Sequence, residues 1–196
     1  MTGVSPEART RLLALLTTLS FERRDVILSS GAPSTFYLDC KQTALHPEGA
    51  WLIGQLLLGL VAEVEAAVGT EAVGVGGLTL GADPLATATS LASRNRAHPL
   101  AAFIVRKEPK GHGTGAWIEG RRNLPDGCPV ILLEDVVTSG GATLKALERV
   151  REEGLRPLGV AALVDRMAGG VERLRAEGLV VRTLFQATDF PGVSSP

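Results

Sequence analysis

Lysine and cysteine are both scarce in this chain of 196 residues. Its two cysteines, Cys40 and Cys128, form no C-x-x-C motif and are too few for a disulfide framework. We therefore expect a reducing compartment and a cytoplasmic protein. Only four of the twenty basic residues are lysines, so lysines that lie close together in the sequence are informative: Lys41, Lys107, Lys110 and Lys145.

The chain also lacks a strong charge bias and a long apolar run. Its formal net charge is −1, so no overall positive field would attract nucleic acid or a membrane surface. The longest apolar stretch, Trp51 to Val64, contains Gln55 and Glu63 and is too short to span a bilayer. The sequence begins without a basic region and an apolar core, so we expect no signal peptide.

Hydrophobic residues make up 45% of the chain, enough for a sizeable core. Short apolar runs alternate with helical patterns, which predicts a mostly parallel sheet covered by helices on both faces. We expect one α/β domain over residues 1–196, without repeats or a linker. Helix starts are expected at Ser5-Pro6, His46-Pro47 and Asp83-Pro84, with Asp83 as an N-cap and His46 in a capping role. The buried strands are expected near 71–77, 101–105, 130–133, 158–164 and 179–184, and a further strand could start at Val26. We expect the helix that starts at His46-Pro47 to end near Gly69, and Gly154 to be the C′ glycine of the helix after Thr143.

The most informative stretch is Val130 to Thr143, which reads V-I-L-L-E-D-V-V-T-S-G-G-A-T. A buried strand, Val130–Leu133, is followed at once by Glu134 and Asp135, where we expect the strand to leave the sheet. A loop of small and hydroxyl residues then leads into a helix. Backbone N–H groups at a helix N-terminus bind phosphate well, and glycines allow the backbone to approach an anion closely. Carboxylates suit sugar hydroxyls or a hydrated Mg²⁺.

This stretch is neither a Walker A loop nor G-x-G-x-x-G. It resembles the signature of type I phosphoribosyltransferases, which bind 5-phosphoribosyl 1-diphosphate (PRPP). The resemblance implies that Glu134 and Asp135 contact the ribose hydroxyls and that Asp135 is also catalytic. It implies no direct metal ligand in the protein, because Mg²⁺ would arrive as its complex with PRPP near this pair. The loop that would bind the 5-phosphate comprises Val136, Val137, Thr138, Ser139, Gly140, Gly141, Ala142 and Thr143.

A second cationic stretch, R-K-E-P-K-G-H-G-T-G, follows the strand expected at 101–105. It has no core-facing period and should form an exposed loop, which by itself could be an ordinary solvated basic segment. It resembles the R-K-E-x-K-x-H-G-x-G catalytic loop of orotate phosphoribosyltransferases. The resemblance implies a homodimer in which loop 106–115 reaches the partner's site. It assigns PRPP binding to four residues, the last three also catalytic: Arg106, Lys107, Lys110 and His112.

The segment S-S-G-A-P-S-T-F-Y-L-D-C-K, residues 29–41, resembles the N-terminal substrate loop of the same family. The resemblance implies that Phe36 and Tyr37 cover the pyrimidine and that residues 1–45 form a small substrate-covering region. Many family members have a basic residue where this chain has Ser29, and we consider Lys41 a substitute. The loop 78–83 also lacks the lysine that orotate enzymes often carry.

Asp165 and Arg166 end the strand expected at 158–164 and could simply form a surface ion pair. In the family that this chain resembles, the arginine of such a D-R pair faces the orotate carboxylate, which suits a planar guanidinium. The resemblance implies orotate binding by Phe36, Tyr37, Thr138 and Arg166.

The implied reaction is the transfer of the 5-phosphoribosyl group from PRPP to orotate, giving orotidine 5′-monophosphate and diphosphate in pyrimidine synthesis. Two alternatives stay open at this point. A related enzyme could use another base. Arg166 distinguishes this alternative from orotate, because its guanidinium suits the carboxylate that orotate carries. A PRPP-sensing regulator could retain the binding loop without chemistry, although such proteins tend to lose the catalytic loop and to carry a DNA-binding module, and this chain has no such module.

Overall fold

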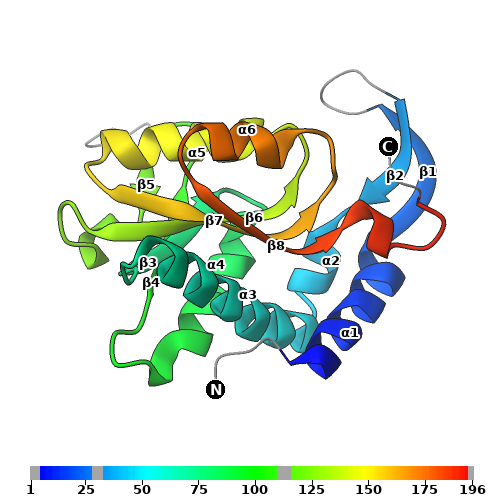
Figure 1. Ribbon diagram of the computed structural model, residues 1–196, viewed down its shortest axis with the longest axis horizontal. Helices are drawn as coiled ribbons and strands as arrows, with labels where there is room; N and C mark the ends of the chain where they lie inside the picture. Colours follow the sequence, from blue (N-terminus) through cyan, green and yellow to red (C-terminus); the bar gives the residue numbers. More distant parts are fainter. Residues whose placement is uncertain (1–4, 28–32, 110–115, 194–196) are drawn as a thin grey trace.

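A six-stranded sheet lies at the centre of the computed structural model, which describes residues 5–27, 33–109 and 116–193 (Figure 1). The strand order is β5-β4-β3-β6-β7-β8, and every neighbouring pair is parallel except β4 and β5. This arrangement confirms the predicted fold class. The strands are β3 (Gly74–Leu78), β4 (Ala101–Val105), β5 (Ile118–Glu119), β6 (Pro129–Val137), β7 (Arg156–Asp165) and β8 (Val180–Gln186).

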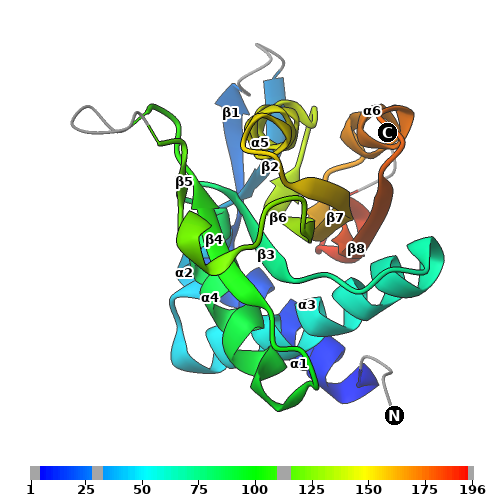
Figure 2. The same cartoon turned by 90° about the vertical axis from the view of Figure 1, so that its left-hand side faces the viewer.

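Helices cover both faces of this sheet, as Figures 1 and 2 show. Helices α5 (Gly141–Glu152) and α6 (Gly170–Ala176) lie on one face, α5 against β3, β6 and β7. Helices α3 (Pro47–Val68) and α4 (Ala82–Ala92) lie on the other, α3 against β7 and β8 and α4 against β3 and β4. A strand buried on both faces needs apolar residues throughout, which explains the uninterrupted run Val130–Leu133.

Helix α3 begins and ends where the sequence predicts. His46 is its N-cap, with Nδ1 accepting from the Gly49 N–H, and Gly69 ends it in the left-handed conformation. By length and composition alone α3 could cross a membrane, but half of its most apolar window is buried inside the protein. It packs between the sheet and α1 (Pro6–Leu15), whose predicted cap Ser5 is confirmed. Its apolar character is therefore accounted for by the core.

The N-terminal region adds a separate antiparallel hairpin, β1 (Phe21–Ile27) with β2 (Pro33–Leu38). The sequence suggested a strand starting near Val26, which was wrong: β1 begins at Phe21, directly after a π-helical turn (Leu16–Ser20). The start is early because the Phe21 ring packs against two other aromatic rings, Phe36 of β2 and Phe190, with ring centroids 5.3 Å away in each case. This contact fixes the hairpin to the C-terminal part of the chain.

The remaining elements are short. Helix α2 (Cys40–Ala44) follows the hairpin and contacts α3 and α4. Single 3₁₀ turns connect longer elements at Ser93–Asn95, Arg121–Asn123 and Ala187–Asp189. The predicted C′ glycine of α5, Gly154, is confirmed: its φ is +73° and its N–H donates to the Arg151 carbonyl.

Candidate active site

The acidic pair lies on β6, which runs further than the sequence predicts. We expected the strand to leave the sheet at Glu134, but β6 continues to Val137. The reason is unequal pairing: β6 pairs with β3 only as far as Leu132, whereas its pairing with β7 extends to Asp165. The last part of β6 therefore borders the loop that follows β3, and residues 134 and 135 lie near the carboxyl-terminal edge, where ligands bind in open α/β sheets.

Glu134 is buried, with 6% of its surface exposed. The Thr143 hydroxyl, in the first turn of α5, donates to Glu134 Oε2 over 2.7 Å. Burial is the main reason that the pKa of Glu134 rises from 4.5 to about 8, and the neighbouring Asp135 carboxylate adds to the rise. A proton is thus held at this site in the ligand-free protein near neutral pH.

Asp135 is only half-buried, and its Oδ1 accepts from the Val136 N–H at 2.8 Å. The backbone of Gly81, in the loop after β3, comes so close that a Cβ atom there would lie 2.8 Å from this carboxylate. On a third side, burial and then the Asp135 charge raise the pKa of Cys40 well above its ordinary value. The loop after β3 therefore lies directly against the Asp135 carboxylate, and Cys40 of α2 is near enough for the Asp135 charge to affect its thiol.

The loop from Thr138 to Gly140 turns β6 into α5. Gly140 has φ +75°, a left-handed conformation that favours glycine, and a Cβ atom there would lie 3.1 Å from the Gly170 carbonyl oxygen. No side chain caps the first turn of α5 within the described residues. At Gly141 an added Cβ would meet only the Ser139 hydroxyl, 3.6 Å away. The helix start thus offers open backbone N–H groups of the kind that bind phosphate.

The loop between β3 and α4 differs from its prediction. Asp83 is not the N-cap: α4 begins at Ala82 after Gly81, and Asp83 lies in the first turn. Its Oδ2 accepts from the Thr79 hydroxyl at 2.8 Å, which draws the carboxylate back across the loop. The Thr79–Leu80 peptide bond is cis. This loop forms the side of the site opposite α5.

The cationic loop is described only in part. Arg106 follows β4, its backbone N–H donates to the Trp117 carbonyl, and its guanidinium pairs with Glu119 over 2.9 Å. Lys107 is described as well, whereas Lys110 and His112 lie outside the described residues. Arg106 is therefore engaged with Glu119 in the ligand-free protein.

The predicted orotate residues come from β2, from Thr138 in the loop after β6, and from the segment after β7. The Arg166 backbone N–H donates to the Val137 carbonyl, and its guanidinium donates to the Phe36 carbonyl oxygen. That guanidinium also lies 5.1 Å from the centroid of the Phe36 ring. Burial lowers the pKa of Arg166. The structure thus brings Phe36, Arg166 and the end of β6 together.

The side chains of Phe36 and Tyr37 have different surroundings. Phe36 is buried and packs edge-on against Phe190 with ring centroids 5.5 Å apart, so its ring is part of the core. Tyr37 is partly exposed, and the Arg24 guanidinium lies 3.8 Å from its ring centroid. Only Tyr37 presents a ring toward solvent from this strand, since neighbouring strand residues face opposite sides.

Sequence reasoning missed two residues at this site, Arg24 and Gly81. Arg24 reaches Tyr37 through the hairpin pairing, which no local motif announces. Gly81 could have been found as a lone glycine before a helix start, but its closeness to Asp135 depends on the strand order.

Lys41, the possible substitute for the basic residue absent at Ser29, lies near this site. Its ammonium pairs with Asp39 over 2.5 Å, and its pKa is raised mainly by that contact and also by Asp135 and Tyr37. Ser29 itself lies outside the described residues.

Several curated proteins resemble this chain over nearly its whole length, although no protein-family model matches it. The orotate phosphoribosyltransferase of Sorangium cellulosum is 47% identical over 193 residues, covering 97% of this chain and 96% of that protein. The orotate phosphoribosyltransferase of Aquifex aeolicus is 46% identical over 162 residues, covering 83% of this chain and 84% of that protein.

Solved structures agree with this likeness. Mycobacterium tuberculosis orotate phosphoribosyltransferase in complex with Fe(III) dicitrate superposes with a TM-score of 0.77 at 38% identity, covering 93% of this chain and 98% of that chain. The same enzyme in complex with PRPP gives a TM-score of 0.74 at 37% identity with the same coverage. The chain therefore belongs to the orotate phosphoribosyltransferase family.

Proposed function

We propose that this protein transfers the 5-phosphoribosyl group from PRPP to orotate, giving orotidine 5′-monophosphate and diphosphate in pyrimidine biosynthesis. The observation that carries the proposal is the end of β6, where Asp135 faces Gly81 and Glu134 accepts from Thr143 in the first turn of α5. This arrangement puts two carboxylates between a helix start with open backbone N–H groups and a second loop. A phosphorylated sugar carrying a diphosphate needs groups of these kinds on both sides.

The two carboxylates would hold the ribose hydroxyls of PRPP. Asp135, half-exposed, accepts hydrogen bonds directly, while Glu134 is held by Thr143. The 5-phosphate would bind the backbone N–H groups of the loop Val136–Thr143, with hydroxyl donors from Thr138 and Ser139. The left-handed Gly140 supports this role because it opens the first turn of α5 to an anion.

The diphosphate would be held by cations and by Mg²⁺ arriving with PRPP. Among residues 5–27, 33–109 and 116–193, no three His, Cys, Asp or Glu side chains are grouped to bind a metal ion. Mg²⁺ commonly keeps several waters and binds through substrate phosphates, so it would arrive as its PRPP complex near Glu134 and Asp135. The metal would supply positive charge that stabilises the leaving diphosphate. The protein's own cations for this task would be Arg106, Lys107, Lys110 and His112.

Orotate would bind beside Arg166, with its carboxylate on the guanidinium and Tyr37 over its ring, while Phe36 and Thr138 complete the surroundings. Support comes from the contact between Arg166 and the Phe36 carbonyl, which fixes the arginine next to β2. Positive charge develops on the ribose as the diphosphate leaves, so water must be excluded until the orotate nitrogen forms the new bond. The region 1–45 would provide this cover.

A homodimer would complete the site, with loop 106–115 reaching the partner's active site. Exposed large apolar residues support an interface, since a partner chain would remove them from water. Four of them lie directly after α2, on α3, in the loop before α4 and on α4: Leu45, Trp51, Leu80 and Leu91. We also propose a cytoplasmic location, in keeping with the free, buried Cys40 and Cys128.

The test is an absorbance assay with purified protein, PRPP, Mg²⁺ and orotate. We expect a PRPP-dependent loss of the orotate band that stops when Mg²⁺ is chelated. Turnover of uracil or a purine but not orotate would retain PRPP transfer and overturn the roles of Arg166 and Tyr37. PRPP binding without turnover of any base would instead favour a regulatory protein.

A further inference from the structure

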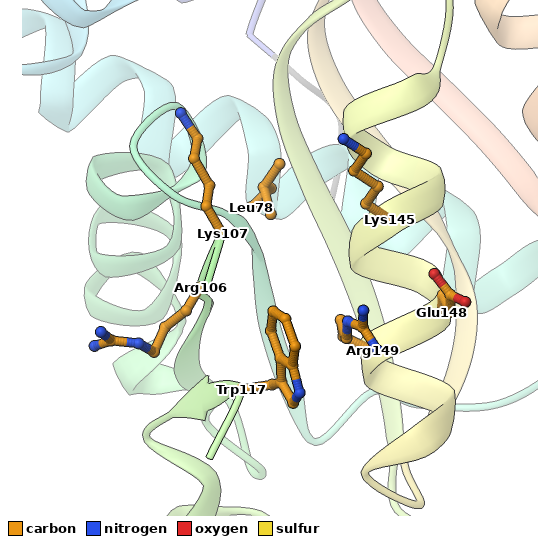
Figure 3. A pocket seen from close by; sticks show the side chains of 7 residues that line it. All are labelled: Leu78, Arg106, Lys107, Trp117, Lys145, Glu148 and Arg149. Carbon is orange, nitrogen blue, oxygen red and sulfur yellow. The ribbon is translucent and has the colours of Figure 1, made fainter. Parts of the chain in front are cut away.

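A pocket of about 370 Å³ lies between the segment that follows β4 and helix α5 (Figure 3). This volume falls within the roughly 300–1,000 Å³ typical of small-molecule sites. Four of the seven lining residues are cationic and only one is acidic, and two of the chain's four lysines are among them. The lining residues are Leu78, Arg106, Lys107, Trp117, Lys145, Glu148 and Arg149.

The cations do not all face the pocket in the same way, as Figure 3 shows. Lys107 and Lys145 extend from opposite walls toward the same end, with Leu78 between them. At the other end, the Arg149 guanidinium stacks on Trp117, 3.9 Å from the ring centroid. The Arg106 guanidinium points away, toward its partner Glu119, and the Glu148 carboxylate points away from the centre.

The two ammonium groups lack an anionic partner in the described part of the chain, where neither Lys107 nor Lys145 forms an ion pair. Arg149 pairs with Glu152, which does not line the pocket, over 2.5 Å. Two ammonium groups, unpaired among the described residues, and one paired guanidinium therefore border one hollow, and the repulsion between the ammonium groups falls when an anion enters. The stacking on Trp117 also holds the planar Arg149 guanidinium in place before any ligand binds.

We infer that this pocket is a second anion site, which takes a chain of linked phosphates such as a di- or triphosphate. Two lysines act as point charges for phosphate oxygens, and a third cation at the far end suits an extended polyanion better than a single phosphate. The pocket is separate from the phosphate loop, because Gly140 does not line it and because Lys145 and Arg149 lie about 1.4 and 2.5 turns further along α5.

Occupation of this pocket has a consequence that rests on the proposed function. Lys107 is expected to serve the leaving diphosphate, and one ammonium group cannot serve both anions fully. A polyphosphate in the pocket therefore inhibits turnover by engaging Lys107. Replacing Lys145, which has no role in the proposed reaction, relieves this inhibition and leaves turnover without the inhibitor unchanged.

The protein contains a built-in reporter for the test, because Trp51 and Trp117 are its only tryptophans. In a Trp51→Phe background, inorganic tripolyphosphate is titrated without Mg²⁺ while Trp117 emission is followed. We expect a saturable change whose midpoint rises about tenfold in Lys145→Ala, the equivalent of one charge-assisted contact. Arg151→Ala is the matched control on the same helix: Arg151 pairs with Glu177 outside the pocket, and its loss leaves the midpoint unchanged. An unchanged emission, or the same midpoint in Lys145→Ala, overturns the inference.

A nucleoside triphosphate is titrated in parallel to identify the source of the polyanion. Tighter Lys145-dependent binding than tripolyphosphate supports a nucleotide, and equal or weaker Lys145-dependent binding supports free polyphosphate. The two proposals fail separately. Lys145-dependent emission in a protein that does not turn over orotate supports this site and rejects the enzyme, whereas turnover of orotate without Lys145-dependent emission rejects this site alone.

Discussion

At the scale of single residues, Glu134 and Asp135 show how adjacent carboxylates acquire different properties. They alternate along β6, so one side chain turns into the protein beneath α5 and the other stays partly in solvent. Burial raises the pKa of Glu134 to about 8, and Asp135 remains open to ligands. The sequence predicted both residues as ligands of the sugar but could not show that only Glu134 is buried, because burial depends on the position of α5.

The pKa of Glu134 predicts a pH-dependent stability. Between pH 4.5, its ordinary pKa, and about 8, the folded protein holds a proton that the unfolded chain has released. Stability from this group is complete below pH 4.5 and is lost as the pH rises toward 8, because the native state binds more protons. We expect the melting temperature of the ligand-free protein to fall more steeply between pH 5 and 8 than that of Glu134→Gln. Parallel curves in thermal unfolding would show that Glu134 is ionised in the native state.

Gly81 permits a second prediction at this scale. A Cβ atom at position 81 would lie 2.8 Å from the Asp135 carboxylate, closer than real contacts allow, so Asp135 must move. We expect Gly81→Ala to lower kcat/KM for PRPP about tenfold or more, since displaced catalytic groups lose orientation. The melting temperature should change little because Asp135 is half-exposed and can shift. The comparison needs steady-state kinetics and thermal unfolding of the same preparation, and unchanged kinetics would place Asp135 outside the reaction.

At the scale of elements, local patterns predicted the helices and buried strands more reliably than their ends. The starts of α1 and α3 were correct because Ser5 and His46 cap them within one turn. The end of β6 was wrong because pairing with β7 carries the strand past Glu134. Asp83 failed as an N-cap because its carboxylate bonds to Thr79 instead. The β6 failure comes from pairing with another strand, whereas the Asp83 failure comes from a competing hydrogen bond within its own loop.

The cationic loop supplies the prediction for an element. Lys110, outside the described residues, is expected to stabilise the charge that develops on the leaving diphosphate. We expect Lys110→Ala to lower kcat about a hundredfold or more, as the loss of one such contact typically does. Arg122→Ala is the control, since Arg122 is an exposed cation on the turn Arg121–Asn123 and should not affect kcat. Near-normal turnover of Lys110→Ala would remove the loop from catalysis.

At the scale of the molecule, the strand order decides which predicted segments meet. The sequence indicated a parallel sheet, but not that β3 and β6 are neighbours, and this adjacency brings Gly81 to Asp135. It also could not locate Phe36, whose ring lies in a cluster with Phe21 and Phe190 from distant parts of the chain. Apolar side chains such as Leu80 and Leu91 remain exposed in the single chain. The molecule that we expect to act is therefore a pair of chains.

Mixing two inactive variants tests this expectation. In a symmetric dimer with exchanged loops, a chain carrying Lys110→Ala keeps an intact acidic pair, and a chain carrying Asp135→Asn keeps an intact loop. A mixed dimer then has one complete site, and equal random mixing should restore about a quarter of wild-type activity. Co-expression with two different tags isolates the mixed dimers. If each loop serves its own chain, no mixture regains activity, because every site lacks either Lys110 or Asp135.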